Sequence, residues 1–157
     1  MKLSLLVIGK TTDKHVQVLI NDYACRLSHY VPFSLDVIPE LKSTKALTID
    51  QQKAMEAELI RCQLQPGDHI VLLDEHGTER RSVEFATWLG KRLAAGSRRI
   101  VFIVGGPYGF DAAIHQLAAE EISLSQMTFS HQLIRLLFVE QLYRACTIMR
   151  GEPYHPE

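Results

Sequence analysis

The stretch Ile100–Gly109 reads I-V-F-I-V-G-G-P-Y-G and decides the fold. Its first five residues are apolar and mostly β-branched, which is typical of a strand buried on both faces of a parallel sheet. The glycines and the proline that follow allow a tight turn and a close approach of the backbone to another group. Ligands of open α/β sheets lie at the carboxyl ends of the strands, so the stretch indicates a pocket. A plain turn from strand to helix is the alternative that the stretch alone leaves open.

Strands and helices alternate along the chain on both sides of this stretch. Apolar runs bounded by Gly or Pro predict the strands, and apolar residues at helical spacing behind a capping residue predict the helices. This order predicts an α/β fold of one domain, residues 1–157, with a mostly parallel sheet and helices on both faces. We expect strands at 3–8, 33–37, 69–73, 100–104 and 122–124, and helices at 13–30, 48–64, 82–96, 111–120 and 132–149.

Several local features of these elements can be predicted. The alternation of polar and apolar residues in 33–37 favours an edge strand or a strand with one polar face. Residues 74–77, D-E-H-G, are expected to leave the third strand as a loop. Within the second helix Met55 is expected to point inward. The expected helix caps are Asp13, Thr48 with Gln51 as a capping box, Ser82 and Asp111.

The composition favours a globular protein of the cytoplasm. Hydrophobic residues make up 46% of the chain and charged residues 22%, and the net charge is −1. No apolar run approaches the roughly 18 residues that span a membrane, and the short apolar N-terminus is read as a strand rather than a signal peptide. Cys25, Cys62 and Cys146 are far apart and none lies in a C-x-x-C pair, so we expect reduced thiols.

The charge pattern favours a cationic ligand. Residues 100–130 contain no Lys or Arg but hold Asp111, Glu120 and Glu121, so this stretch is poorly suited to phosphate, although chance could produce the pattern in a short segment. The glycine patterns of dinucleotide and P-loop sites and the G-x-S-x-G motif of hydrolases are missing. Histidine spacing typical of a metal site is missing too, so no metal is expected.

Three loops at strand ends are expected to form the walls of one pocket. They are Leu73–Asp74, Gly105–Gly106 and residues 125–130, and together they suit a flat aromatic group. Met127 and Phe129 either line this pocket or fill the core. His131 stands at the start of the last helix beside the pocket, where a structural role is the alternative.

The C-terminal motifs resemble those of a bacterial enzyme family. They read I-V-G-G-P-Y-G-F at 103–110, S-L-S-Q-M-T-F-S-H-Q-L-I-R at 123–135, E-Q-L-Y-R-A at 140–145 and G-E-P-Y-H at 151–155. In this order and spacing they resemble the ribosomal RNA large subunit methyltransferase H family, of the SPOUT (trefoil-knotted) superfamily. The opening M-K-L-S-L-L-V-I-G-K and the length agree, so the resemblance covers the whole chain.

The resemblance implies an enzyme that uses S-adenosyl-L-methionine to methylate N3 of a pseudouridine in large-subunit rRNA, within the assembled ribosome. It also implies a homodimer and a C-terminal trefoil knot that holds the cofactor. The cofactor-binding residues it implies are Leu73, Gly105, Gly106, Ser125, Gln126, Met127, Thr128, Phe129 and Ser130. The residues it implies near the cofactor or the RNA are His131, Arg135, Tyr143, Arg144, Tyr154 and His155. One of His131, Arg135, Tyr154 and His155 is expected to help form the nucleophilic anion, and the sequence does not choose among them. The arginines Arg135, Arg144 and Arg150 are expected to flank the cofactor on the RNA side, with Tyr143.

Two residues depart from the family pattern. Ser130 replaces a proline, which predicts a less rigid turn, and Pro156 replaces a basic residue in the tail. Two other functions stay open at this point. One is a non-catalytic RNA-binding or ribosome-assembly factor of the same fold, and the other is a nucleotide-binding α/β protein with no RNA partner.

Overall fold

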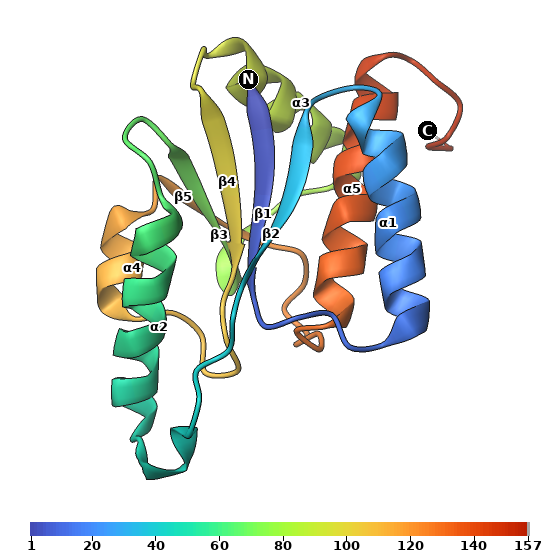
Figure 1. The fold of residues 1–157 in the computed structure, drawn as a ribbon. Coiled ribbons are helices and arrows are strands. Elements are labelled where there is room, and N and C mark those ends of the chain that lie inside the picture. Colours follow the sequence, from blue (N-terminus) through green and yellow to red (C-terminus); the bar gives the residue numbers. More distant parts are fainter. Residues whose placement is uncertain (157) are drawn as a thin grey trace.

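Five parallel strands form the sheet at the centre of the molecule (Figure 1). The computed structural model describes residues 1–156. The strands follow the order β2-β1-β4-β3-β5 across the sheet, which confirms both the parallel sheet and the edge position of the second strand. Their bounds are β1 Lys2–Ile8, β2 Phe33–Ile38, β3 His69–Glu79, β4 Arg99–Val104 and β5 Glu120–Ser123.

Helices cover both faces of this sheet, as predicted. On one face α1, α3 and α5 enclose the larger part of the core, and on the other face α2 and α4 enclose the smaller part (Figure 1). A short 3₁₀ turn at Thr44–Ala46 precedes α2. The described residues include no helix that is long and apolar enough to cross a membrane. The helices are α1 Lys14–Ser28, α2 Ile49–Gln63, α3 Ser82–Ala94, α4 Ala112–Leu117 and α5 Leu133–Met149.

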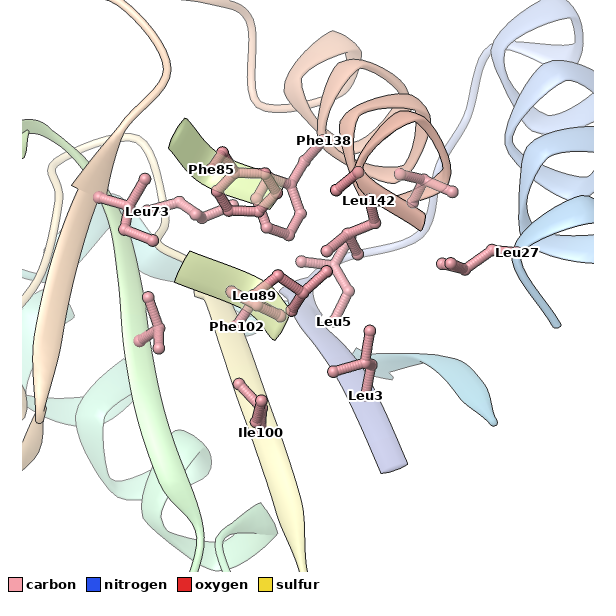
Figure 2. Close-up of a cluster of buried hydrophobic side chains, with 14 of the residues drawn as sticks. Leu3, Leu5, Leu27, Leu73, Phe85, Leu89, Ile100, Phe102, Phe138 and Leu142 are labelled. Carbon is pink, nitrogen blue, oxygen red and sulfur yellow. The ribbon is translucent and has the colours of Figure 1, made fainter. Parts of the chain in front are cut away.

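The larger core lies between the sheet and the three helices α1, α3 and α5 (Figure 2). Alternate residues of a strand point to opposite faces, so Leu3 and Leu5 of β1 enter this core while Leu6 enters the other. Phe102 of β4 packs against Phe138 of α5, with ring centroids 4.7 Å apart. Both rings are fully buried, and this contact seats the C-terminal helix on the central strand.

Most of the predicted helix caps are confirmed. Asp13 accepts hydrogen bonds from the backbone N–H groups of His15 and Val16, Thr48 and Gln51 form the expected capping box, and the Asp111 carboxylate accepts from Ala113 N–H. Ser82 is a correction, because α3 has its N-cap at Arg81 and the Ser82 hydroxyl donates instead to Gln141 Oε1, 3.0 Å away.

The inward face of α2 differs from the prediction by one residue. Met55 is 45% exposed, whereas Glu56 beside it is only 5% exposed and packs toward the sheet with Ala57 and Ile60. The buried face of an amphipathic helix is normally apolar, so an inward glutamate could not be read from the pattern. The side chain of Glu56, with its carboxyl group, is therefore buried in the interior of the protein.

The loop predicted at 74–77 is part of a longer strand. β3 continues to Glu79, and Leu73 and Thr78 both pair with Ile122 of β5, so the residues between them bulge from the ladder. Gly77 makes this possible, because a Cβ there would lie 2.7 Å from the backbone of Glu121 and Ile122. The bulge begins at Asp74, just beyond Leu73, where the pairing of β3 with β4 ends. β5 also begins earlier than predicted, at Glu120, and α4 accordingly ends at Leu117.

After β5 the chain crosses from one edge of the sheet to α5, which lies beside α1 (Figure 1). Gln132, just before α5, anchors this crossing to the segment after β1. Its side-chain amide donates to the Lys10 carbonyl at 3.1 Å and accepts from Thr12 N–H at 2.8 Å. The crossing thus joins the segment before α5 to the segment after β1 at the carboxyl edge of the sheet.

Candidate functional site

A cavity of about 610 Å³ opens at the carboxyl ends of the central strands. Its walls are the segments 73–76, 104–110 and 124–131. They contain the stretches Leu73–Asp74, Gly105–Gly106 and 125–130 that the sequence predicted to meet, although the first of these belongs to β3 and is not a loop. The volume lies in the range of small-molecule and cofactor sites. Of the predicted cofactor-binding residues, the cavity is lined by Leu73, Gly105, Gly106, Ser125, Met127, Thr128, Phe129 and Ser130, while Gln126 does not line it.

The glycine loop between β4 and α4 forms one wall. The Gly109 N–H donates to the Gly106 carbonyl at 3.1 Å, and Gly109 has a φ of +82°, which closes a tight turn. A Cβ on Gly105 would lie 3.2 Å from the Phe110 ring, and one on Gly106 would lie 2.6 and 2.7 Å from the two carboxyl oxygens of Glu56. The loop therefore needs glycine for the packing behind it as well as for access to the cavity in front.

The segment after β5 forms the opposite wall and is held by its own side chains. The Ser125 hydroxyl accepts from Met127 N–H at 3.0 Å, and the Thr128 hydroxyl donates to Glu75 Oε2 at 2.7 Å. Met127 is 77% exposed, so it lies at the mouth of the cavity rather than in the core. Ser130 accepts from the N–H groups at 132 and 133, each at 3.2 Å, and so caps α5. Its hydroxyl thereby supplies hydrogen bonds that the usual proline lacks.

The rim of the cavity carries the carboxylates of Asp74 and Glu75. Glu121 lies outside the lining, but its ligand atoms and those of Asp74 and His115 lie within 4.8 Å of one another, and His115 Nδ1 is 2.9 Å from Glu121 Oε1. Among the residues described they form the one group of three possible metal ligands, which the spacing of the histidines could not reveal. Lys53 of α2 is the one Lys or Arg among the lining residues. The rim thus favours a ligand with positive charge.

His131 is the one predicted catalytic residue that lines the cavity in the described part of the chain. Its side chain is exposed, and its carbonyl accepts a hydrogen bond from Arg135 Nε at 2.9 Å. Because α5 starts two residues later, the helix fixes the backbone from which the imidazole reaches the cavity.

Arg135 lies elsewhere than predicted. Its side chain is 1% exposed and faces neither the cavity nor solvent. Its guanidinium donates to the carbonyls of Ile8 and Gly9, each at 2.8 Å, and to the Thr11 hydroxyl at 3.1 Å. Burial lowers the pKa of Arg135. The residue is a buried brace between α5 and the end of β1, and nothing in the sequence around it signalled this burial.

The tail residues Tyr154 and His155 do not line the cavity of their own chain. The Tyr154 hydroxyl donates to Glu140 Oε1 at 2.9 Å, and Arg144 Nη1 lies 2.9 Å from His155 Nδ1. Arg144 also stacks on the Tyr154 ring, 4.7 Å from its centroid. Burial, followed by hydrogen bonds with Tyr23 and Glu140, raises the pKa of Tyr154 well above its usual range.

The remaining residues predicted for RNA lie in this same region, beside α1. Tyr143 packs edge-on against Tyr154, with ring centroids 4.7 Å apart, and the Arg150 guanidinium lies 4.6 Å from the centroid of the Tyr30 ring. Apart from Arg135, which is buried, and Gln126, which does not line the cavity, the predicted site residues fall into two groups. One group surrounds the cavity, and the other covers the surface formed by α1, α5 and the tail (Figure 1).

The fold and the cavity define a class of protein. The chain has a parallel sheet whose carboxyl edge carries a glycine loop, and the segment after β5 crosses from the edge of the sheet to α5. Residues 1–155 match the sequence model of the family described as "Predicted SPOUT methyltransferase". The chain is a SPOUT methyltransferase, and the trefoil knot that the resemblance implied goes with this class.

Individual relatives place the chain within that class. The "Ribosomal RNA large subunit methyltransferase H" of Bacteroides fragilis is 58% identical over 157 residues, 100% of each chain, and that of Porphyromonas gingivalis is 51% identical over the same span. Among solved structures, the SpoU methyltransferase AviRb from Streptomyces viridochromogenes, in complex with the cofactor AdoMet, aligns with a TM-score of 0.46 and 14% identity over 95% of this chain and 58% of that one. The chain belongs to the ribosomal RNA large subunit methyltransferase H family, which confirms the resemblance drawn from its motifs.

Proposed function

We propose that this enzyme uses S-adenosyl-L-methionine to methylate N3 of a pseudouridine in large-subunit rRNA, within the assembled ribosome of the cytoplasm. The observation that carries the proposal is the glycine-walled cavity with its acidic rim, in a member of a family whose relatives are named rRNA large subunit methyltransferases. No metal takes part in this proposal.

The lining of the cavity fits an adenosyl group with a cationic centre. Backbone groups of Gly105, Gly106 and the segment 125–130 would bind the edge of the adenine, and Leu73 and Phe129 would pack against its faces. The carboxylates of Asp74 and Glu75 would favour the positive sulfonium and amino groups. The cofactor supplies an electrophilic methyl group, and the protein has to position the nucleophile in line with it.

The target nitrogen is an imide that must lose a proton to become a nucleophile. His131 is the predicted catalytic residue of the cavity that could accept it, because its imidazole is exposed there and an imidazole can act as a general base. Arg135 has no part in this step, since its donors are occupied by buried carbonyl and hydroxyl oxygens.

The tail residues can act in transfer only in a cavity other than their own, which supports a homodimer. α1 exposes the apolar side chains of Val18, at 67%, and Leu19, at 44%. The same helix contacts the tail, because the hydroxyls of Tyr23 and Tyr154 lie 3.5 Å apart, and α1 lies beside α5 (Figure 1). We place the dimer contact on this side of the molecule, with the tail of one subunit beside the cavity of its partner. Apolar side chains exposed on one helix are typical of protein interfaces.

Recognition of RNA then depends on the dimer and on the folded ribosome. A net charge of −1 gives little general affinity for free RNA. Arg144, Arg150 and Tyr143 would lie along the RNA between the two subunits, and Arg150 would supply the tail cation that Pro156 lacks. The enzyme would select the target hairpin by the shape of the RNA and its position in the folded ribosome rather than by the nucleotide sequence.

Calorimetry with S-adenosyl-L-methionine and its demethylated product tests the cofactor. It is followed by tritiated methyl transfer to ribosomes from a strain that lacks the modification. We expect binding of both compounds and transfer of one methyl group per ribosome. Failure of the wild-type protein to bind either compound would exclude the proposed enzymatic function. Binding of the cofactor without methyl transfer would favour an assembly factor of the same fold. Gly106→Val should abolish binding, because the new side chain meets Glu56 and displaces the loop.

Mixed dimers test the role of the tail. The Tyr154→Ala/His155→Ala variant should bind the cofactor but lose transfer, while Gly106→Val should lose cofactor binding. If the tail acts in the partner's cavity, mixing the two inactive variants produces dimers with one complete site and restores up to about a quarter of wild-type activity by random pairing. Dimers that stay inactive after mixing would place the tail in its own cavity or outside the reaction.

A further inference from the structure

The carboxyl group of Glu56 is buried under the glycine loop without adequate partners. The residue is 5% exposed. Its Oε2 accepts one long hydrogen bond from Gln52, at 3.5 Å, and its Oε1 has no partner among the described residues. Nearly all buried polar groups in native proteins are hydrogen-bonded, so this carboxyl requires an explanation.

The carboxyl occupies the space that a side chain at Gly106 would fill. A Cβ there would lie 2.6 Å from Oε1, 2.7 Å from Oε2 and 2.9 Å from Cδ. Gly106 itself lines the cavity, whereas Glu56 does not. The loop backbone is therefore a thin layer with the cavity on one side and the Glu56 carboxyl on the other.

This arrangement lowers the stability of the empty protein. The surroundings on this face of the sheet are apolar, with Ala57, Ile60 and Phe110 in the same core cluster, and burial raises the pKa of Glu56. An apolar side chain of similar volume would satisfy the site better, because it would leave no buried acceptor unpaired. Groups that weaken the empty fold at a binding loop commonly serve the bound state.

We propose that Glu56 is a positioning residue of the cofactor site, whose carboxyl group supports Gly106 from behind and accepts hydrogen bonds from the peptide N–H groups of the glycine loop when the cavity is occupied. The unpartnered Oε1 is the acceptor that this role needs, and Gly106 is the residue that lets it approach. The inference rests on the proposed function, since it assigns to Glu56 the support of the loop that would bind the cofactor.

Two substitutions separate this role from simple packing. Glu56→Leu fills the space without polar atoms, and Glu56→Gln keeps the shape and a carbonyl acceptor. Glu58→Leu and Glu58→Gln are matched controls, because Glu58 lies on the exposed face of the same helix and pairs only with Arg61. For each variant the thermal midpoint of the empty protein, the Kd for S-adenosylhomocysteine, and the KM and kcat for transfer are measured.

We expect Glu56→Leu to melt at or above the wild-type temperature and to bind the cofactor product at least about tenfold more weakly, with the loss in the KM for the cofactor. Glu56→Gln should stay within about threefold of wild type, and both controls should be unchanged. Wild-type affinity in Glu56→Leu would overturn the proposal. So would a lower melting temperature with unchanged affinity, or an equal loss of affinity in Glu56→Gln, which would show that the charge is what matters.

Hydrogen exchange of the loop amides supplies a readout that needs no cofactor. Even in the empty protein, transient hydrogen bonds to Glu56 should slow amide exchange at residues 105, 106, 108 and 109, so Glu56→Leu should speed this exchange and Glu56→Gln should not. Equal exchange in all variants would contradict the proposal. The wild-type protein could fail to bind the cofactor while exchange at the loop amides still differs between the wild type and Glu56→Leu. That result would contradict the proposed function but not the support of the glycine loop by Glu56.

Discussion

At the scale of single residues, Arg135 shows how one buried side chain holds distant segments together. Its hydrogen bonds join the end of β1, Thr11 and the His131 carbonyl at the entry to α5. Arg135→Met should therefore lower the free energy of unfolding by about 3 kcal/mol, since several buried acceptors lose their donor. Urea unfolding measures this change.

Arg26 is the matched control for that experiment. It is an exposed arginine paired with Asp22 at 3.3 Å on the surface of α1, and Arg26→Met should change the free energy of unfolding far less than Arg135→Met, because solvent screens an exposed ion pair. A similar small change in Arg135→Met would contradict the bracing role.

Gly77 makes a second prediction at this scale. A methyl group there would lie 2.7 Å from the backbone of β5, which cannot move without breaking the pairing of β3 and β5. Gly77→Ala should destabilise the protein by about 2 kcal/mol in thermal or urea unfolding. Gly90→Ala, where the methyl group would meet only the flexible Met149 sulfur at 3.2 Å, should leave stability equal or higher, because alanine favours the helix interior. Equal losses in the two variants would argue against the close strand contact.

At the scale of elements, the start of α5 depends on the hydroxyl of Ser130. It accepts two backbone N–H groups of the first turn, and Gln132 at the formal cap position makes no side-chain capping bond. Ser130→Ala should cost about 1 kcal/mol of stability by thermal unfolding. Ser28→Ala at the end of α1, whose exposed hydroxyl donates to the Cys25 carbonyl, should stay within about 0.5 kcal/mol. No loss in Ser130→Ala would mean that water replaces the cap.

Elements defined by local signals were predictable from the sequence, and those defined by neighbouring strands were not. The caps at Asp13 and Thr48 lie within a few residues of the groups they bind, so sequence spacing reveals them. The continuation of β3 past Leu73 depends on a register shift against β5, which lies more than 40 residues further along the chain. The D-E-H-G sequence at 74–77 has turn chemistry, and tertiary pairing overrides it.

The candidate site was predictable where its residues are consecutive in the sequence. The glycine loop and most of the segment 125–130 line the cavity together. The grouping of Asp74, His115 and Glu121 was missed because these residues come from three elements, and only the fold brings them within 4.8 Å. Glu56 was missed because a polar residue on an inward helix face has no sequence signature.

At the scale of the whole molecule, burial separates the three cysteines. Cys25 and Cys62 are exposed, whereas Cys146 is 3% exposed in the larger core. A chromogenic disulfide reagent at pH 8 should titrate two thiols rapidly in the native protein and the third only after unfolding. Rapid reaction of all three would contradict the packing of α5 on the sheet.

The same burial makes stability depend on alkaline pH. Burial raises the pKa of the Cys146 thiol from 9.0 to about 11. Between these values the unfolded chain releases a proton that the native protein keeps, so the free energy of unfolding should fall as pH rises through this window. Urea unfolding from pH 8 to 11 should show a shallower decline in Cys146→Ala than in the wild type. Parallel curves would show that other groups, such as tyrosines, cause the decline.

The brace between α5 and β1 also sets the order in which the chain can mature during translation. β1 and α1 leave the ribosome first, yet Arg135 and Gln132, which hold the segment after β1, are synthesised near the end. A nascent chain that still lacks α5 exposes the apolar faces of α1 and the sheet, because Phe138 and Leu142 are not yet there to cover them. The amino-terminal half of the chain therefore cannot complete its tertiary packing until the residues of α5 have been synthesised.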